Sequence, residues 1–464
     1  MADTLAMPTP AQVEGFRSRF QGEVITPADA GFDDGRRVWN ALYDLRPAIL
    51  VRPTSTAEVA AAIRFGRDAG VPIEIRGGGH GVWAPGMAQG GLHIDLGRLN
   101  AVTVDPEART AHVGGGALLS ALDQAAQAHG LVCPVGVIGH TGVGGLTLGG
   151  GIGRLMRRFG LTIDNLRRVE LVTATGDVVE ASADEHPDLF WGIRGAGANF
   201  GAVTEFVFDL QPYDGRLTRG IRMYDGRQIR DVWEVFQRFA ATATDSLGMT
   251  FGAGRAVPEA DYPEAIAGKP MAFVAFSHSG DPATVEDDLA ALAAGPKPAF
   301  EALTPTTYLE IQAVNDEAMR WGLRTWTDSR FSNGFGAGTL EAVIEHIANA
   351  PGDAGIGVGT FGGAVGRIAD DATSFPSRAA FDMSADAGAW EDPADDERHI
   401  AWARQAMAIM ERDAVTGRYV NETCETGEAV VRSTYGAERY DRLVALKRAW
   451  DPDNVFRANQ NVAP

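Results

Sequence analysis

Residues 71–81 read VPIEIRGGGHG, a short alternating strand followed by a turn of four glycines around one histidine. Upstream, residues 47–51 have the pattern of a strand, and residues 54–70 that of a helix with a hydroxyl cap. Strand, helix and strand within about 30 residues make a βαβ unit. Glycine is needed where the backbone adopts a positive φ or approaches another group closely, so the turn is a candidate binding loop. Spacing alone also allows His80 to be an ordinary turn or surface residue.

A second glycine-rich run, TGVGGLTLGGGIG, occupies residues 141–153. Of the 57 glycines in the chain, 27 fall within residues 77–201. They have no Gly-X-Y period and alternate with apolar strand-like runs, which excludes collagen and low-complexity sequence. Consecutive N–H groups in such turns form a concavity for anions, and missing Cβ atoms let a diphosphate approach. Either turn alone is equally typical of a loop-rich structure, but two in one region favour a nucleotide cofactor.

Other nucleotide-binding motifs fit poorly. A P-loop needs Gly-x-x-x-x-Gly-Lys-Ser/Thr, and Gly268-Lys269 is followed by proline. A Rossmann fingerprint needs Gly-x-Gly-x-x-Gly between a strand and a helix. No clear strand precedes residues 149–153, and residues 195–197 lack the third glycine at the required spacing.

The composition is that of a folded, acidic protein. A chain of 464 residues exceeds what one hydrophobic core usually covers, so two or more packed units are expected. The formal net charge of −20 argues against a nucleic acid or an anionic membrane as partner. Cys133 and Cys424 are too few for a disulfide framework or a cysteine-rich zinc site, and no metal site is expected. Residues 1–10 lack the features of a signal peptide, and no run approaches the ~20 apolar residues of a membrane helix, so we expect a cytoplasmic protein.

Several motifs are specific in combination. They are Arg76–His80, Ile94–Leu96, Val113–Gly116, His140–Gly153, Asp188–Trp191, Gly195–Gly201, Val203-Thr204, Tyr419–Asn421 and Asp451–Phe456. Together they resemble the berberine bridge enzyme-like branch of the vanillyl-alcohol oxidase superfamily, whose members have a PCMH-type FAD-binding domain. The resemblance spans roughly residues 20–462.

The resemblance implies an α+β protein with a two-part FAD-binding domain and a substrate domain whose antiparallel sheet is covered by helices. The expected divisions are an N-terminal segment (1–45), the FAD-binding domain (46–213), the substrate domain (214–415) and a C-terminal segment that returns to the FAD domain (416–464). Residue patterns beyond residue 213 indicate helices at 229–241, 283–294 and 440–450, and strands at 270–277, 356–361 and 381–384.

The family resemblance implies that His80 bonds covalently to the 8α carbon of FAD. Some members carry a second bond from a cysteine eleven residues before the Gly-Gly-Gly turn. That position is Ile138 here, and Cys133 lies five residues too early. We therefore expect a single link, with Cys133 a small buried apolar residue.

For the chemistry, the resemblance implies that Tyr419 and Asn421 project from a strand toward the flavin, with Tyr419 as the base. Such a base needs a nearby positive or donor group, because an ordinary tyrosine has a pKa near ~10. Thr141, close to valine in shape, is expected to admit oxygen to the flavin or else only to pack locally. The expected cofactor-binding residues are Arg76, Gly77, Gly78, Gly79, Gly81, Thr141, Gly142, Gly144, Gly145, Gly149, Gly150, Gly151, Gly153, Val203 and Asn459.

The substrate pocket has no motif of its own. Candidates are Trp83, Tyr308, Trp321 and Arg324, with Trp326 and Arg378 as further possibilities; core packing or a solvated ion pair is the alternative for each. The leading function is an oxidase that takes hydride from a C–H next to O or N of a small molecule and reduces O2 to H2O2. The alternatives are a flavin dehydrogenase, an oxygenase or cyclase of natural-product tailoring, and a flavin-binding protein without turnover. The substrate (amine, alcohol, sugar or polyketide) and the choice between monomer and homodimer stay open.

Overall fold

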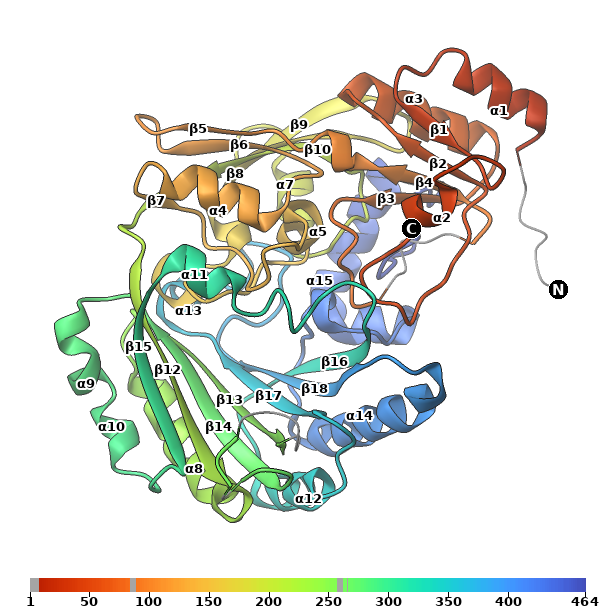
Figure 1. Cartoon of the computed structure of the whole chain (residues 1–464). Helices are drawn as coiled ribbons and strands as arrows, with labels where there is room; N and C mark the ends of the chain where they lie inside the picture. The colour runs from red at the N-terminus through yellow and green to blue at the C-terminus, as the bar shows by residue number, and fades with distance from the viewer. Residues whose placement is uncertain (1–7, 84–88, 257–261, 265) are drawn as a thin grey trace.

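The computed structural model describes residues 8–83, 89–256, 262–264 and 266–464. Residues 1–7, on which much of the signal-peptide prediction rests, lie outside this description. No helix among the described residues is long and apolar enough to cross a membrane. The α+β class is confirmed: a four-stranded and a five-stranded sheet occupy the upper part of Figure 1 and a seven-stranded sheet the lower part, and a two-stranded pair joins Leu131–Val132 to Gln211–Pro212.

The first sheet contains the predicted βαβ unit. Helix α3 (Thr56–Asp68) begins after Ser55, whose side chain accepts a hydrogen bond from the Glu58 N–H, and it buries Val59 and Ile63 against the sheet. Its strand order is β1-β2-β4-β3, and β2 and β3 both run parallel to β4, which lies between them. The strands are β1 (Glu23–Ile25), β2 (Ile49–Arg52), β3 (Ile73–Arg76) and β4 (Leu92–Asp95).

The second sheet is five-stranded and antiparallel, in the order β5-β6-β10-β8-β9. Its strands are β5 (Val102–Asp105), β6 (Thr110–Gly114), β8 (Leu166–Val172), β9 (Val178–Ser182) and β10 (Ala202–Asp209). Helices α4 (Leu119–Gln127), α5 (Val143–Leu148) and α7 (Pro187–Ile193) share its apolar core. The short α5 lies inside the second glycine run, where the sequence predicted only a turn.

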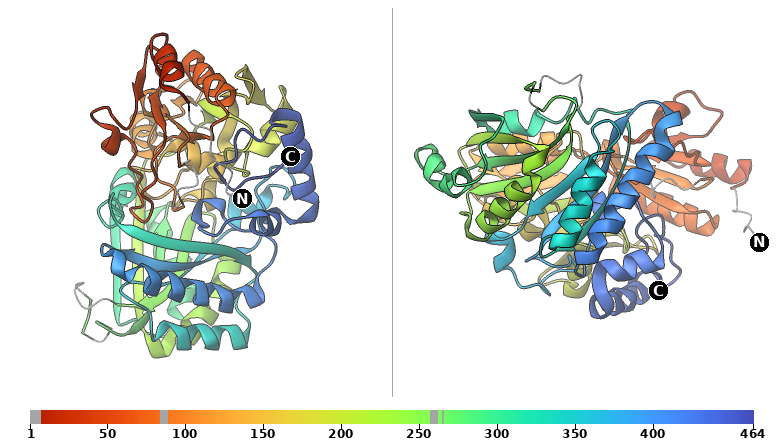
Figure 2. Two further views of the ribbon diagram at one scale, coloured as in Figure 1. Left: turned by 90° about the vertical axis from the view of Figure 1, so that its right-hand side faces the viewer. Right: turned by 90° about the horizontal axis from the view of Figure 1, so that it is seen from below.

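The third sheet has seven strands in the order β15-β12-β14-β13-β17-β18-β16, all antiparallel. Helices α8 (Ile229–Thr242), α12 (Ala337–Ile347) and α14 (Asp396–Met410) cover its outer face, as the view from below shows (Figure 2). Trp233, Phe236 and Trp402 are buried between these helices and the sheet. The strands are β12 (Arg216–Asp225), β13 (Leu247–Arg255), β14 (Pro270–His278), β15 (Phe300–Thr307), β16 (Arg324–Ser332), β17 (Gly355–Thr360) and β18 (Phe381–Trp390).

Two helix predictions need correction. The helix expected at 283–294 is broken into α9 (Val285–Asp288) and α10 (Ala290–Ala293). The helix expected at 440–450 is the second half of α15 (Glu428–Trp450), which kinks where Gly436 has φ +70°. Helix α15 packs on α7 and places Tyr435 and Leu443 in the core of the second sheet, so the chain after the large sheet returns to the first half of the molecule.

Candidate active site

A cavity of about 1140 Å³ lies between the glycine turns and the inner face of the seven-stranded sheet. Ordinary small-ligand pockets measure roughly 300–1,000 Å³, so this one has room for a large group as well as a small substrate. Its walls include the turn at 77–81, residues 141–142 and 196–198, and the C-terminal residues 419–422 and 458–460.

The two glycine turns pack backbone against backbone. A Cβ on Gly78 would lie 2.4 Å from the Gly142 nitrogen, and one on Gly142 would lie 2.2 Å from the Gly78 nitrogen. Gly79 has φ +67°, which suits glycine best. The N–H groups of residues 77–81 form no hydrogen bonds with the part of the chain that the structure describes. They are therefore available to a ligand, as an anion-binding turn requires.

His80 lies in the cavity, held between two aromatic rings. Its imidazole stacks on the Trp39 indole, with ring centroids 4.1 Å apart, and the His140 ring lies 4.8 Å away. Burial, assisted by His140, lowers the pKa of His80 to about 3, so the ring is neutral. Its Nε2 is buried and has no hydrogen-bond partner among the described residues. Trp39 was not predicted as a site residue, because it lies 41 positions before His80 and belongs to no recognised motif.

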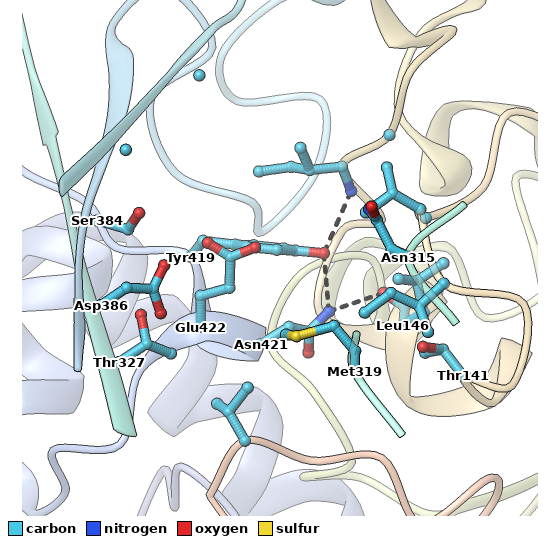
Figure 3. A pocket seen from close by; sticks show the side chains of 18 of the residues that line it. Thr141, Leu146, Asn315, Met319, Thr327, Ser384, Asp386, Tyr419, Asn421 and Glu422 are labelled. Carbon is cyan, nitrogen blue, oxygen red and sulfur yellow. Dashed lines mark hydrogen bonds between the residues drawn. The ribbon is translucent and has the colours of Figure 1, made fainter. Parts of the chain in front are cut away.

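Tyr419 and Asn421 meet at the cavity wall, although not on a strand as expected. Tyr419 precedes a 3-10 turn at Val420–Glu422, and this turn brings the two side chains together. The Tyr419 hydroxyl accepts hydrogen bonds from the Ile152 N–H (3.2 Å) and from Asn421 Nδ2 (3.0 Å). Asn421 Nδ2 also donates to the Leu146 carbonyl at 3.0 Å (Figure 3).

The environment of Tyr419 is wrong for the predicted base. Burial, with Glu422 nearby, raises the pKa of Tyr419 well above its usual value. No cation contacts its hydroxyl among the described residues. The phenol therefore keeps its proton at neutral pH and is a hydrogen-bond donor to whatever occupies the cavity.

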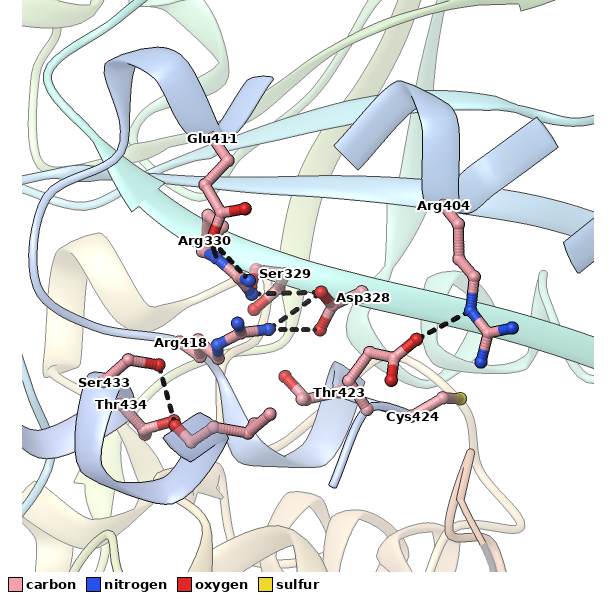
Figure 4. Close-up of polar contacts among 12 residues, drawn as sticks. Asp328, Ser329, Arg330, Arg404, Glu411, Arg418, Thr423, Cys424, Ser433 and Thr434 are labelled. Atoms are coloured by element: carbon pink, nitrogen blue, oxygen red, sulfur yellow. Dashed lines mark hydrogen bonds and ion pairs between the residues drawn. The ribbon is translucent and has the colours of Figure 1, made fainter. Parts of the chain in front are cut away.

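Buried charges fix the segment that carries Tyr419. Arg418 Nη1 donates to both carboxylate oxygens of Asp328 at 2.8 Å (Figure 4). The Tyr419 N–H donates to Ser329 Oγ at 2.8 Å. Arg330 joins Asp328 (3.0 Å) to Glu411 (2.9 Å). Strand β16 thus holds the Tyr419 segment from behind.

Three carboxylates that the sequence analysis missed also line the cavity: Asp382 and Asp386 on β18, and Glu422. Figure 3 shows Asp386 and Glu422 on the same side of the pocket as Thr327 and Ser384. Burial raises the pKa of Asp382 to about 7 and that of Asp386 to about 6. Burial and the two aspartates raise the pKa of Glu422 well above its usual value. Nothing in the local sequence of a strand marks such residues, because their proximity comes from the sheet.

Most of the predicted site residues line the cavity. Arg76 does so while its guanidinium pairs with Asp95 at 2.5 Å, so it supports the turn rather than presenting a free charge. Asn459 Nδ2 donates to the Ala198 carbonyl at 2.9 Å, and its buried Oδ1 has no partner among the described residues. The lining residues among the predicted set are Arg76, Gly77, Gly78, Gly79, His80, Gly81, Trp83, Thr141, Gly142, Gly145, Gly153, Tyr419, Asn421 and Asn459.

Five residues predicted to bind the cofactor do not line the cavity. Each of them packs closely against other parts of the chain. A Cβ on Gly149 would lie 2.2 Å from Asn421 Oδ1, one on Gly150 2.5 Å from the Phe375 ring, and one on Gly151 2.1 Å from Thr162 Oγ1. Gly144 and Val203 likewise border the backbone of Gly115 rather than the cavity.

Three predicted pocket residues also lie elsewhere. Tyr308 is buried beneath α4, where burial and Asp123 raise its pKa. Arg324 pairs with Asp396 at 2.5 Å. Trp321 is 43% exposed and borders a smaller hollow outside the turn at 77–81.

The cavity has one histidine suited to a covalent bond and no cysteine among its described lining residues. Ile138 lines it, as expected, whereas Cys133 and Cys424 are buried elsewhere. Burial raises the pKa of both thiols, which makes them poor nucleophiles.

Comparison with known proteins identifies the family. Residues 47–182 match the model of an FAD binding domain, and residues 418–463 match that of the berberine and berberine-like proteins. The chain is 31% identical to (R)-6-hydroxynicotine oxidase of Paenarthrobacter nicotinovorans, over 96% of this chain and 97% of that protein. The chain belongs to the berberine bridge enzyme-like FAD-linked oxidoreductases. Its FAD-binding region and its C-terminal segment each match one of the two family models.

Solved structures agree on the fold. That of 6-hydroxy-D-nicotine oxidase from Arthrobacter nicotinovorans superposes with a TM-score of 0.85 at 29% identity, covering 96% of this chain and 98% of that one. A xylooligosaccharide oxidase from Myceliophthora thermophila, in complex with xylobiose, gives a TM-score of 0.85 at 22% identity, with 98% and 99% coverage, and shares the fold. An FAD-linked oxidoreductase of Bacillus subtilis, YgaK, is 28% identical over 97% of this chain and 98% of its own length.

The residues present fit FAD. An added Cβ on Gly145 or Gly197 would meet nothing within 4 Å, although both residues line the cavity, so open space adjoins them. The unpaired N–H groups of residues 77–81 suit a diphosphate. His80 Nε2 and Asn459 Oδ1 are buried polar atoms without a hydrogen-bond partner among the described residues, as expected of atoms that contact a ligand.

Proposed function

We propose that the protein is an FAD-dependent oxidase whose flavin is attached by one covalent bond to His80. It removes hydride from a C–H next to O or N of a small organic molecule and passes the electrons to O2, giving H2O2. The observation that carries this proposal is the His80 imidazole: neutral, aligned by Trp39 and unpaired in a glycine-lined cavity.

The covalent bond needs a neutral imidazole nitrogen, because a protonated ring has no free lone pair. The low pKa of His80 provides this at every physiological pH. The bond replaces one hydrogen of the imidazole and one of the flavin 8α-methyl group. Those two hydrogens reduce one O2 to H2O2, which balances the step.

Bound FAD supplies the acceptor for the substrate hydride. The proton that leaves the substrate needs a base in the same cavity, and Asp382 has a pKa close to the working range. Burial and the neighbouring aspartates also raise the pKa of Glu422, which shares this environment. We assign proton removal to the Asp382–Glu422 pair and a donor role to Tyr419, with Asn421 fixing the phenol.

Thr141 lines the cavity, which supports its proposed role in admitting oxygen. Thr141→Leu should slow reoxidation of the reduced enzyme by O2 and leave its reduction by substrate unchanged. A dehydrogenase or an oxygenase remains the alternative. Reduction of a dye without oxygen uptake would establish a dehydrogenase. Incorporation of labelled oxygen into the product would establish an oxygenase.

Acid precipitation of the holoprotein tests the flavin bond. The pellet should be yellow, the His80→Ala pellet colourless, and the Cys133→Ala pellet as yellow as the wild type. A colourless wild-type pellet would end the covalent proposal. Release of H2O2 with a panel of amines, alcohols and sugars then tests the oxidase reaction.

A further inference from the structure

Strand β17 leaves a bare strip on the inner face of the large sheet. Gly355, Gly357 and Gly359 alternate along it, so one of its faces carries no side chain. All three line the cavity. A Cβ on Gly359 would contact only the Asp382 backbone oxygen (3.8 Å) and its Cβ (3.9 Å), so open space lies above that position.

The two edges of this strip differ in chemistry. On one side, Gly359, Gly357 and Gly355 pair in register with Asp382, Ser384 and Asp386 of β18, so a polar row borders the glycines. On the other side the register continues to Gly252 of β13, and the Phe273 ring of β14 lies over that residue, 2.2 Å from where its Cβ would be. Met271 and Ala275, two residues to either side of Phe273, extend an apolar wall.

The polar row is acidic and lacks a counter-charge. Asp382, Asp386 and Glu422 form no ion pair with any described residue. The segments outside the description, 1–7, 84–88, 257–261 and 265, contain no Lys, Arg or His. Asp386 is surrounded by protein, which raises its pKa, and its accessible surface lines the cavity.

One buried carboxylate oxygen of the row also lacks a partner. Asp382 is 7% exposed and its Oδ1 forms no hydrogen bond with the described residues. Thr327 of β16, in register with Asp386, is 4% exposed, and its hydroxyl lies beside the Asp386 carboxylate and lowers the pKa of that group. A native structure rarely leaves such a buried acceptor unsatisfied, so Asp382 Oδ1 points to a ligand that donates a hydrogen bond.

The cavity's arginines do not supply the missing charge. Arg76 pairs with Asp95, and Arg255 donates to the Gly268 carbonyl at 3.1 Å. Arg219 belongs to β12, which three strands separate from β18, and Arg154 lies before α6 (Met156–Phe159). A further acid, Asp353, lines the cavity near Asp386 and adds to the negative potential.

We propose that the substrate is an amine that binds as a cation, its ammonium group at Asp382, Asp386 and Glu422 and its flat apolar body on the glycine strip against Phe273. This rests on the proposed function and names its substrate class. A buried carboxylate without a partner is costly, and an ammonium group both neutralises it and donates hydrogen bonds to it. The same carboxylates then take the proton that an ammonium must lose before hydride leaves the adjacent carbon.

Calorimetric titration of the FAD-loaded protein with benzyltrimethylammonium, which has no N–H to lose, reads binding without turnover. We expect Asp386→Asn to weaken this binding at least tenfold and to leave the affinity for benzyl alcohol unchanged. Asp231→Asn, an exposed acid on α8, is the matched control and should change neither. Equal affinity for the two probes, or unchanged cation binding in Asp386→Asn, would overturn the proposal.

The strip is tested separately with Gly359→Val, a substitution that suits a strand and meets only ordinary contacts. Benzyltrimethylammonium should bind at least tenfold more weakly, whereas tetramethylammonium should bind as before. Preferred H2O2 release with alcohols or sugars over amines would refute the amine proposal and leave the oxidase intact. Selective cation binding without H2O2 release from any donor would support the cation site and refute the oxidase function.

Discussion

The His80 imidazole and the Trp39 indole are stacked with their planes 14° apart and their centroids separated by 4.1 Å. The indole is itself fixed, because its Nε1 donates to the Met319 carbonyl at 2.6 Å and its backbone N–H donates to the Gly79 carbonyl at 2.9 Å. The N-terminal segment thereby aligns the ring proposed to hold FAD.

Trp39→Phe should lower the fraction of FAD attached covalently, because the smaller ring loses both the indole hydrogen bond and part of the stacking surface. Acid precipitation followed by absorbance of pellet and supernatant measures this fraction. His80→Ala gives the zero point. If Trp39→Phe attached FAD completely and at the wild-type rate, the stacking would not matter for the attachment.

Tyr419→Phe should slow flavin reduction about fivefold, as expected for the loss of one hydrogen bond of ~1 kcal/mol, and should leave the pH profile in place. The reason is that the phenol keeps its proton, so it does not titrate near neutrality. Stopped-flow reduction between pH 5 and 9 is the measurement. Disappearance of a limb of the profile would restore the tyrosine as base.

Asp382 makes the protein less stable as pH rises. Its pKa is about 7 when folded and near its ordinary value of 3.8 when unfolded, so the folded state binds the extra proton between these values. Stability therefore falls between about pH 4 and pH 7, and Asp382→Asn should gain on the order of 4 kcal/mol at pH 8 and almost nothing at pH 3.5. Denaturant unfolding at the two pH values checks this; an equal gain at both would contradict it.

Asp328→Asn should destabilise the protein by about 3–5 kcal/mol, because it leaves Arg418 and Arg330 buried beside a neutral amide. The double substitution Asp328→Leu with Arg418→Met should recover most of that loss in thermal unfolding. It should not recover activity if the ion pair positions Tyr419. Full activity in the double variant would reduce the pair to a purely structural role.

Substitution of Gly145 and of Gly149 should have opposite effects on FAD loading and turnover. Gly149→Ala places a Cβ 2.2 Å from Asn421 Oδ1, so it should displace that side chain and lower turnover while FAD loading persists. Gly145→Ala meets no protein atom within 4 Å, so the fold should tolerate it and FAD loading should fall. Flavin absorbance per protein, read beside the rate of flavin reduction, separates the two. Normal loading in Gly145→Ala would place the cofactor elsewhere.

The sequence predicted those features that local chemistry encodes. The βαβ unit follows from periodicity and capping, and the turn at 77–81 from its glycines. Glycine signals a close approach without naming the approaching group, so the sequence does not distinguish a contact with FAD from the close packing of side chains against Gly149, Gly150 and Gly151. The alternation of Tyr419 and Asn421 was assigned to a strand, although a 3-10 turn also brings the two together.

The three carboxylates of the cavity could not be predicted from the sequence for a different reason. Asp382 and Asp386 become neighbours of the glycines of β17 only through sheet register, and Glu422 joins them from a separate segment. No spacing within one stretch of sequence specifies that arrangement.

The return of the chain after the large sheet also sets an order of assembly during synthesis. Tyr419, Asn421 and Asn459 complete a cavity whose opposite wall begins at Val38, so more than 400 residues separate its first and last contributions. A ribosome that has made only the glycine turns and the first two sheets has made an open half-site. Capture of FAD therefore belongs to the nearly finished chain, and stalling before residue 419 should yield protein without flavin, however well its first half has folded.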